Sequence, residues 1–376
     1  MSASVIGIVG ATGAVGRATM RELLESGSWP LRLGSRRPLQ VLEELATHGR
    51  RVDTRHLDVR DAESLRDFCA GCRVVVNCAG PSFELLDIVA RAALDSGADY
   101  VDPGGDEPLR ERLAPLHLAR TGRVALITAG MMPGISALLM RRLASEPGLR
   151  GGNLIAHVGG RGRISTAAAL DYILSLGHDP EASLAIWRGG ARIPRAMRPR
   201  TDLESPFFAS GATAYPYIGR EVERVARSLG LARVTWFNVF EGTHMTAALA
   251  RLQGAMRGIG DTAAAAAHLA RAAEIDLFGL DPYQLFHLQL EGEADAAPFA
   301  RSIVLRGASA QELTGSMAAL ATESVLRHEI PPGLYFAGEV LTPALVERLK
   351  SMRGITAYSE QTEAPQCGAV VEEGAL

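Results

Sequence analysis

A buried strand, a glycine-rich turn and a helix follow one another at the start of this sequence, in the run VIGIVGATGAVGRATMRELLESG (residues 5–27). Val5–Val9 is continuously apolar, which suits a parallel strand buried on both faces. Gly10, Gly13 and Gly16 then give the spacing GxxGxxG. Positions without side chains let main-chain N–H groups and the N-terminus of the next helix approach a pyrophosphate. The turn therefore predicts a dinucleotide-binding site.

Strand and helix patterns continue to alternate as far as Thr128. Helical patterns cover, for example, Phe83–Leu94 and Leu109–Leu118. Such alternation predicts an α/β fold with a Rossmann-type, doubly wound parallel sheet. The further strands are expected at Leu31–Gly34, Val52–Leu57, Val74–Asn77, Tyr100–Asp102 and Val124–Thr128.

The pattern changes after Gly130, and Asn153–Phe299 is richer in aromatic residues, proline and clustered arginine. Antiparallel strands with helices on one face would fit this segment, which predicts a second domain of α+β type. An alanine-rich helix at Ala310–Arg327 follows, and the polar tail from Ser359 onward is expected to be loose. Within the second domain, helices are expected at Thr166–Leu176, Glu221–Leu229 and Thr262–Asp276, strands at Leu154–Val158, Arg233–Phe240, Phe286–Gly292 and Ser302–Arg306, and an irregular stretch at Trp187–Thr201.

Composition excludes several classes of function. The chain is 47% hydrophobic and 22% charged with a net charge of −3, which gives no electrostatic footprint for nucleic acid or a membrane surface. The N-terminus lacks a basic region, so we expect no signal peptide and a cytoplasmic location.

Cys69 and Cys72 form a CxxC without a second metal pair, which indicates a helix end before a buried strand rather than a metal site. Lys350 is the only lysine, so any mechanism that uses a catalytic lysine depends on it.

The end of the second strand indicates which dinucleotide binds. An NAD site usually has an acidic residue there, which accepts from the ribose 2′-hydroxyl. Here the strand ends in LRLGSRRP, with a serine and two arginines and no acid before Glu43. A hydroxyl and guanidinium groups suit a 2′-phosphate, so NADPH is the expected cofactor. Asp58 is placed to meet the adenine edge, and NCAGP after the fourth strand should line the pyrophosphate and the nicotinamide ribose. The predicted cofactor-binding residues are Gly10, Thr12, Gly13, Ala14, Val15, Gly16, Ser35, Arg36, Arg37, Asp58, Val59, Asn77, Cys78, Ala79, Gly80 and Pro81.

Two rival chemistries are disfavoured by single residues. Extended short-chain dehydrogenases need Tyr-x-x-x-Lys, but Val346 stands four residues before Lys350. Aspartate-semialdehyde dehydrogenases share the spelling GATGAVG, but they need a thiolate nucleophile well down the chain. Cys78 follows the fourth strand too early for that role. Direct hydride transfer without a covalent enzyme intermediate remains.

Together with this chemistry, the motifs of the chain resemble those of the saccharopine dehydrogenase-like (saccharopine reductase-type) family of NAD(P)-dependent oxidoreductases. The resemblance rests on GATGAVGR, VVNCAGP, ALDSGADYVDPGGD, TAGMMPGISALL, LTGSMAALATESVLR and PPGLYFAGEVLTP, which keep their order along the whole chain. It implies a C-terminal helix that returns to the nucleotide domain and an inserted domain for substrate binding and dimerisation. The domains would then be residues 1–130 with 307–376, and 131–306. It also implies NAD(P)H reduction of an imine, or the reverse oxidation, although some relatives reduce enoyl thioesters.

Candidate substrate-binding groups lie around the second domain. Pro133 and Gly134 precede a helix at Ile135–Leu143, whose N–H groups would favour a negatively charged substrate group, unless the segment is only a hinge. Arg161 follows a strand in a glycine-rich segment, where it could clamp a carboxylate, although such arginines are often solvated. Imine reduction needs a proton donor, for which the sequence offers Tyr172 and His244, with Asp171 and Glu241 beside them. The predicted catalytic residues are Tyr172, His244 and Arg161.

The sequence therefore predicts an NADPH-dependent reductase of a C=N bond in a small, carboxylate-bearing substrate, acting as a homodimer and without a metal. Two alternatives stay open at this point. One is an enoyl or thioester-linked reductase that acts on a substrate bound to a carrier protein. The other is an NADPH-sensing regulatory protein, which would bind the cofactor without turnover.

Overall fold

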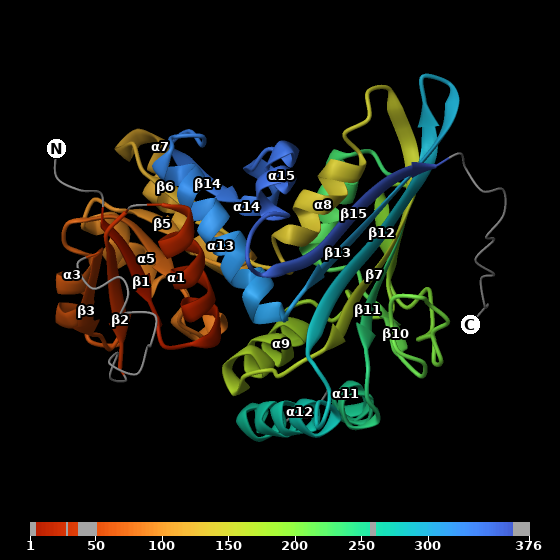
Figure 1. Cartoon of the computed structure of the whole chain (residues 1–376), viewed down its shortest axis with the longest axis horizontal. Helices are drawn as coiled ribbons and strands as arrows, with labels where there is room; N and C mark the ends of the chain where they lie inside the picture. Colours follow the sequence, from red (N-terminus) through yellow and green to blue (C-terminus); the bar gives the residue numbers. More distant parts are fainter. Residues whose placement is uncertain (1–4, 28, 37–50, 256–260, 364–376) are drawn as a thin grey trace. The chain divides into compact units, whose positions relative to one another are not determined.

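The computed structural model describes residues 5–27, 29–36, 51–255 and 261–363. The chain divides into two compact units (Figure 1). Unit 1 comprises residues 1–138 and 311–355, and unit 2 comprises residues 139–310 and 356–376. Each unit is built around its own β-sheet.

The sheet of unit 1 has seven strands in the order β14-β6-β5-β4-β1-β2-β3. Every adjacent pair in it is parallel. The chain order reverses between β1 and β4, which is where an open parallel sheet of this kind binds its ligand. The strands are β1 (Val5–Val9), β2 (Leu31–Ser35), β3 (Val52–His56), β4 (Cys72–Asn77), β5 (Asp99–Val101), β6 (Val124–Ile127) and β14 (Gly333–Phe336).

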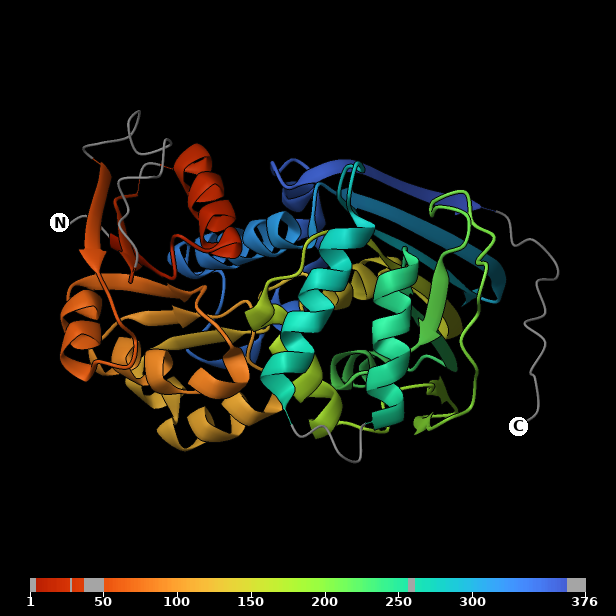
Figure 2. The same cartoon turned by 90° about the horizontal axis from the view of Figure 1, so that it is seen from below.

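Helices cover both faces of this sheet (Figure 2). On one face, α1 (Ala14–Ser26) packs against α13 (Ala310–Leu326), so closely that a Cβ on Gly315 would lie 2.3 Å from the Cβ of Ala18. On the other face, α3, α5 and α6 pack on Val9, Tyr100 and their neighbours. The bounds of these helices and of the short ones are α3 (Ala62–Cys69), α4 (Ser82–Leu85), α5 (Ile88–Asp95), α6 (Glu107–Leu113), α7 (Leu118–Thr121), α14 (Ala337–Val340) and α15 (Val346–Leu349).

Unit 2 contains a mixed sheet in the order β15-β13-β12-β7-β11-β8-β9, with β10 paired to β11. The pair β7–β11 is parallel, whereas β12 runs antiparallel to β7 and to β13. The parallel β7–β11 pair departs from the antiparallel arrangement that the sequence indicates. The strands are β7 (Leu149–Arg161), β8 (Ile186–Arg188), β9 (Ala191–Ile193), β10 (Thr213–Pro216), β11 (Arg233–Phe240), β12 (Tyr283–Ala294), β13 (Ala297–Gly307) and β15 (Ile355–Glu363).

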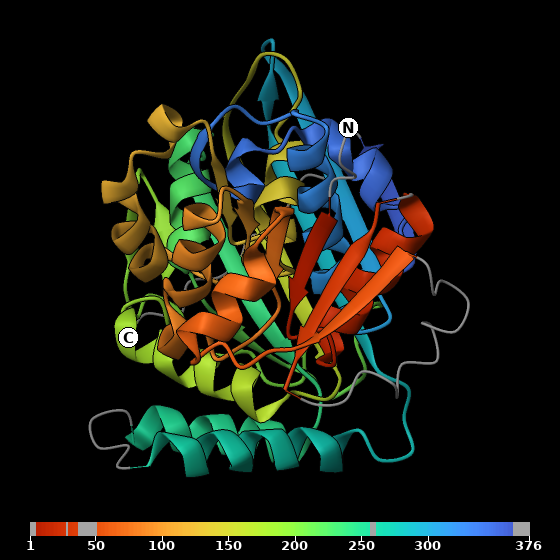
Figure 3. The same cartoon turned by 90° about the vertical axis from the view of Figure 1, so that its left-hand side faces the viewer.

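The helices α11 and α12 of unit 2 lie side by side at one end of the sheet (Figure 3). They share an apolar cluster with α9, in which Ile173, Leu249 and Leu269 are buried. The helices are α8 (Ile135–Leu143), which spans the boundary between the units, and α9 (Thr166–His178), α10 (Arg220–Ser228), α11 (Thr243–Ala255) and α12 (Thr262–Asp276). Among the residues that the structure describes, no helix combines the length and apolar character needed to cross a bilayer.

The predicted fold class, a Rossmann-type parallel sheet with a second α+β domain, is confirmed. Four local expectations are wrong. The helix expected at Leu109–Leu118 ends at Leu113, before His117, whose φ is 47°. The tail is not loose at Ser359, because β15 runs on to Glu363 in the sheet of unit 2. The helix expected at Phe83–Leu94 is divided into α4 and α5 by Leu86, whose φ of 46° is incompatible with a continuous helix. The stretch expected to be irregular from Trp187 contains the β8–β9 hairpin.

Candidate functional site

The first turn places the N-terminus of α1 at the carboxyl edge of the parallel sheet. Gly10 has a φ of +76°, a conformation that glycine adopts without strain. A Cβ on Gly16 would lie 2.3 Å from the carbonyl oxygen of Gly10, so only glycine fits where α1 crosses the turn. Gly13 is the N-cap residue of α1 and has no side chain to compete for the N–H groups of the first helical turn. These groups and the helix dipole suit a pyrophosphate.

The end of β2 carries the groups expected to meet a 2′-phosphate. Ser35 is buried, and its hydroxyl lies 2.6 Å from the Thr12 hydroxyl, which joins the end of β2 to the glycine turn. Arg36 is exposed beside it, and Arg37 lies outside the described residues. Asp58 and Val59 follow β3 and are half-buried, and the Asp58 carboxylate accepts a hydrogen bond from the backbone N–H of Arg60.

The NCAGP loop packs directly against the glycine turn. A Cβ on Gly10 would lie 2.8 Å from the backbone nitrogen of Ala79, and the backbone N–H of Cys78 donates to the carbonyl of Val9. The side-chain oxygen of Asn77 accepts from the N–H of Ala79. The structure thus brings the described part of the predicted cofactor site together at one edge of one sheet, since β1, β2, β3 and β4 end there.

Cys78 lies in this loop in a setting that disfavours a thiolate. Burial raises the pKa of the Cys78 thiol to about 12, an effect opposed by a contact of 3.6 Å with the hydroxyl of Thr19 and reinforced by the nearby Asp102. A thiol that stays protonated is a poor nucleophile. This agrees with a mechanism that needs no covalent enzyme intermediate.

We therefore expect native Cys78 to resist alkylation. At pH 8, iodoacetamide should modify it at least about a hundredfold more slowly than the same cysteine in the unfolded chain, because the thiolate is the reacting form. Mass spectrometry of peptides from native and unfolded protein measures both rates. Rapid labelling of native Cys78, together with complete loss of turnover in Cys78→Ser while NADPH still binds, would support the thioester mechanism instead.

The other cysteines lie away from this edge. Cys69 ends α3 and Cys72 begins β4, and both are buried with a pKa raised chiefly by burial. Within the described ranges, no three His, Cys, Asp or Glu side chains converge as metal ligands. Cys367 lies outside the described residues.

In unit 2, a buried carboxylate gathers three donors at the carboxyl ends of β7 and β11. Glu241, whose side chain is 6% exposed, lies 3.1 Å from Nη1 of Arg161. It also accepts from the backbone N–H of Ala209 at 2.7 Å and from the hydroxyl of Tyr283. The Arg161 Nε donates to the carbonyl of Asp281, and its guanidinium lies 5.2 Å from the centre of the Tyr283 ring. The pKa of Tyr283 is raised, first by burial and then by its hydrogen bond to Glu241.

This cluster joins Arg161 and Glu241, which the sequence singled out separately, and adds Tyr283, which the sequence reasoning missed. The strand register explains the addition, since Tyr283 on β12 lies opposite Arg161 on β7. The guanidinium of Arg161 is thus already paired with a buried carboxylate, which the interpretation as a simple carboxylate clamp did not include.

Tyr172 and His244 contact other residues of unit 2. Tyr172 on α9 packs beside the cluster that α9 shares with α11 and α12, and its pKa is raised by burial and then by Tyr217 and Tyr215. His244, in the first turn of α11, is exposed and places Nδ1 2.8 Å from the carboxylate of Asp276. That carboxylate also accepts from the backbone N–H groups of His244 and Met245. Their assignment as catalytic residues stays a prediction.

The helix after Pro133 does not offer its first N–H groups to a ligand. The N–H of Ile135 donates to the carbonyl of Gly130, and that of Ser136 donates to the carbonyl of Met131. The loop folds back tightly here, with Gly134 at a φ of +130° and its Cα facing the backbone of Gly130 and Thr128. The expectation that these two groups would meet a substrate anion is therefore wrong.

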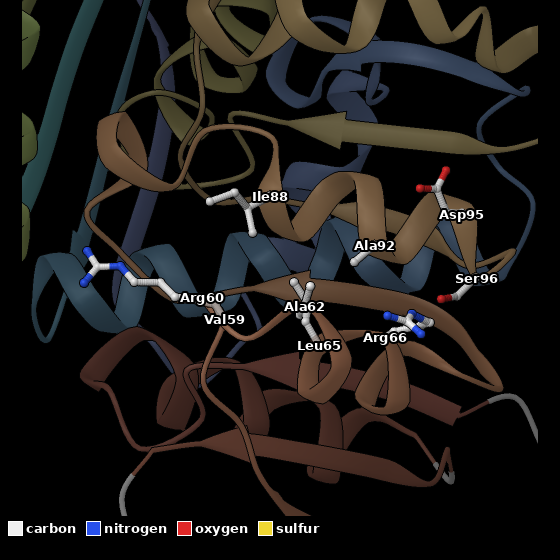
Figure 4. Close-up of a pocket in the computed structure, with 9 residues that line it drawn as sticks. All are labelled: Val59, Arg60, Ala62, Leu65, Arg66, Ile88, Ala92, Asp95 and Ser96. Carbon is white, nitrogen blue, oxygen red and sulfur yellow. The ribbon is translucent and has the colours of Figure 1, made fainter.

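A groove on the helical side of unit 1 has a volume of about 650 Å³ and lies between α3 and α5 (Figure 4). Val59 is the only predicted cofactor residue among its lining, which shows that the groove and the glycine turn are different features. The lining residues are Val59, Arg60, Ala62, Leu65, Arg66, Ile88, Ala92, Asp95 and Ser96.

Comparison with known proteins bears on both units. Residues 6–125 match the family model described as the saccharopine dehydrogenase NADP binding domain. A probable mitochondrial saccharopine dehydrogenase-like oxidoreductase of Arabidopsis thaliana is 33% identical over 119 residues, which cover 28% of this chain and 26% of that protein. This chain therefore matches only about a quarter of the length of that curated relative.

Solved structures resemble the chain over almost its whole length. Apo saccharopine dehydrogenase (L-Glu forming) from Saccharomyces cerevisiae gives a TM-score of 0.66 at 16% identity, covering 96% of this chain and 100% of that one. An engineered D-amino acid dehydrogenase bound to NADP+ gives a TM-score of 0.50 at 15% identity, covering 92% and 99%. At these identities the likeness concerns the fold.

The parallel sheet, its glycine turn and the second mixed sheet define a Rossmann-type dinucleotide-binding protein. Within that class, residues 6–125 match the saccharopine dehydrogenase NADP binding domain, and the chain has the fold of the solved saccharopine dehydrogenase over almost its whole length. The resemblance predicted from the sequence motifs is confirmed.

Proposed function

We propose that this protein is an NADPH-dependent oxidoreductase that reduces a C=N bond in a small, carboxylate-bearing substrate. The observation that carries the cofactor assignment is the glycine turn beside Ser35 and Arg36, within a domain that matches an NADP-binding family. The saccharopine dehydrogenase fold and the amino acid dehydrogenase among the structural neighbours support the reaction class.

The residues at the carboxyl edge of unit 1 fit such a cofactor. The first-turn N–H groups of α1 would hold the pyrophosphate, and Ser35 and Arg36 would hold the 2′-phosphate. The NCAGP loop would hold the nicotinamide ribose. When bound, NADPH supplies the hydride for the carbon of the substrate, and the nitrogen takes up a proton.

In unit 2, we assign substrate binding to Arg161 and proton delivery to Tyr172 or His244. A neutral tyrosine can donate a proton, and burial keeps Tyr172 neutral by raising its pKa. If Nδ1–H of His244 donates to Asp276, then Nε2 is left to exchange a proton. A change of Tyr172 to Phe or of His244 to Gln should separate these two assignments through kcat.

Cofactor titration tests the proposal. The wild-type protein should bind NADPH about 2 kcal/mol, or roughly thirtyfold, more tightly than NADH, because charge-assisted hydrogen bonds to the 2′-phosphate add to the shared contacts. Arg36→Ala should reduce this preference by about tenfold through weaker NADPH binding alone. Fluorescence titration of both cofactors measures the ratio.

Arg66→Ala is the matched control, since Arg66 is an exposed arginine on α3 outside the predicted site. It should leave the ratio unchanged. Equal affinities of the wild-type protein for NADPH and NADH would contradict the cofactor assignment. Turnover is then sought as loss of NADPH absorbance with mixtures of amines and oxo acids, and tight NADPH binding without turnover of any such mixture would favour a regulatory protein.

A further inference from the structure

Asp102 is a buried carboxylate at the carboxyl end of β5, and it is only 3% exposed. It accepts hydrogen bonds from the hydroxyl of Tyr100 at 2.5 Å, from Nδ2 of Asn77 at 3.1 Å and from the backbone N–H of Gly104 at 2.8 Å. A carboxylate has acceptor positions for all three donors, whereas an amide of the same shape has one oxygen and a donating nitrogen. The hydrogen-bond donors around this position therefore match a carboxylate better than an amide.

The contact with Asn77 sets which way the amide of that residue points. Because Asp102 only accepts, Nδ2 of Asn77 must face it, which leaves Oδ1 for the backbone N–H of Ala79 at 3.2 Å. The hydrogen bonds run in series from the end of β5 to the NCAGP loop. Asp102 thereby helps to fix the backbone of the NCAGP loop through the side chain of Asn77.

Asp102 and its neighbour Gly104 also connect the loops that follow the adjacent strands β4, β5 and β6. The backbone carbonyl of Asp102 accepts from the N–H of Ala129, and the carbonyl of Gly104 accepts from the N–H of Thr128. On the other side, the backbone of Cys78 and Ala79 lies against Gly10, where a Cβ would come within 3 Å of it. A shift of the NCAGP loop would therefore reach the glycine turn directly.

We propose that Asp102 is a positioning residue for the nicotinamide half of the dinucleotide site, which it shapes through Asn77 and the NCAGP loop. This inference rests on the proposed function in one respect, namely that NADP(H) occupies this edge of the sheet. It assigns Asp102 no contact with the cofactor.

Two ligands separate positioning from general stability. NADPH occupies the whole site, whereas adenosine 2′,5′-bisphosphate carries the adenine and the 2′-phosphate but no nicotinamide. Asp102→Asn should weaken NADPH binding by about tenfold or more, because an amide cannot satisfy the three donors, and should change the affinity for the bisphosphate by less than about twofold. Calorimetric titration of both ligands measures this difference.

Asp99→Asn is the matched control. Asp99 is 1% exposed at the other end of the same strand, where it accepts from the backbone N–H of Val124 and pairs with Arg73. It should lower the thermal unfolding temperature as Asp102→Asn does, yet leave both affinities near those of the wild type. If Asp102→Asn does not fold, Asn77→Ala cuts the same series of hydrogen bonds while Asp102 keeps its other two donors, and the same selective loss is expected.

The inference is overturned if Asp102→Asn, or Asn77→Ala in its place, binds NADPH like the wild type or loses both ligands in parallel. If the wild-type protein binds the bisphosphate and NADPH with equal affinity, the nicotinamide half makes no contribution and the inference fails while the 2′-phosphate assignment stands. If the wild type binds neither ligand, the proposed function fails first.

Discussion

Gly16→Ala should abolish measurable NADPH binding and lower the stability of unit 1 by about 1–3 kcal/mol, the usual cost of forcing a methyl group into a packed site. The new Cβ would lie 2.3 Å from the carbonyl oxygen of Gly10 and 2.9 Å from the Cα of Ala11. Both neighbours are backbone atoms, so no side chain can rotate away. The only relief is to move α1 away from the turn, which would displace the N–H groups that we propose hold the pyrophosphate.

The steric clash, rather than helix propensity, decides how Gly16→Ala changes the stability of the protein. Alanine is favoured over glycine in a helix by about 1 kcal/mol, so propensity alone would make Gly16→Ala stabilising. Gly177→Ala is the matched control, because Gly177 lies in α9 and a Cβ there would meet nothing within 4 Å. It should stabilise the protein slightly and leave NADPH binding unchanged. Wild-type NADPH affinity in Gly16→Ala would show that the turn is not the binding site.

The nucleotide half of the site could be predicted from the sequence because its determinants are local. The strand, Gly10, Gly13, Gly16 and the helix are consecutive, and the order of parallel strands brings Ser35 and the NCAGP loop to the same edge. Asp102 lies within the motif ALDSGADYVDPGGD, but its proposed role depends on a hydrogen bond to Asn77, 25 residues earlier. No periodicity in the sequence encodes such a pairing.

The candidate site in unit 2 was harder to predict because its partners are far apart in the chain. Arg161 and Glu241 are 80 residues apart, and Tyr283 joins them through the register of β7 with β12. Sequence patterns predict strands but not which strands pair, and a mixed sheet allows many orders. The helix α8 was predicted with its correct bounds. The sequence could not predict that carbonyl groups of the preceding loop accept hydrogen bonds from the first N–H groups of this helix.

Arg161→Ala should lower the free energy of unfolding of unit 2 by about 2–3 kcal/mol, because it leaves the buried carboxylate of Glu241 without its cation. The loss stays below that of a fully isolated charge, since Ala209 and Tyr283 still donate to Glu241. The double variant Arg161→Ala with Glu241→Gln should lose less than the sum of the two single losses, because each single change breaks the same pair. Chemical denaturation of the four proteins measures the coupling.

Arg198→Ala is the control for this prediction, because Arg198 is an exposed arginine of the same unit and should change stability by less than about 0.5 kcal/mol. NADPH affinity should stay unchanged in all these variants, since none of the predicted cofactor residues lies in unit 2. Strict additivity in the double-mutant cycle would contradict an energetically important pair.

The same variants test whether Arg161 also binds the substrate. If the guanidinium holds a substrate carboxylate in the proposed reaction, Glu241 competes with that carboxylate for it. Arg161→Ala should then raise KM by tens- to hundredfold, whereas Glu241→Gln should lower KM by freeing the guanidinium. If both changes raise KM, the pair acts only by holding β7, β11 and β12 together, and the substrate carboxylate is bound elsewhere.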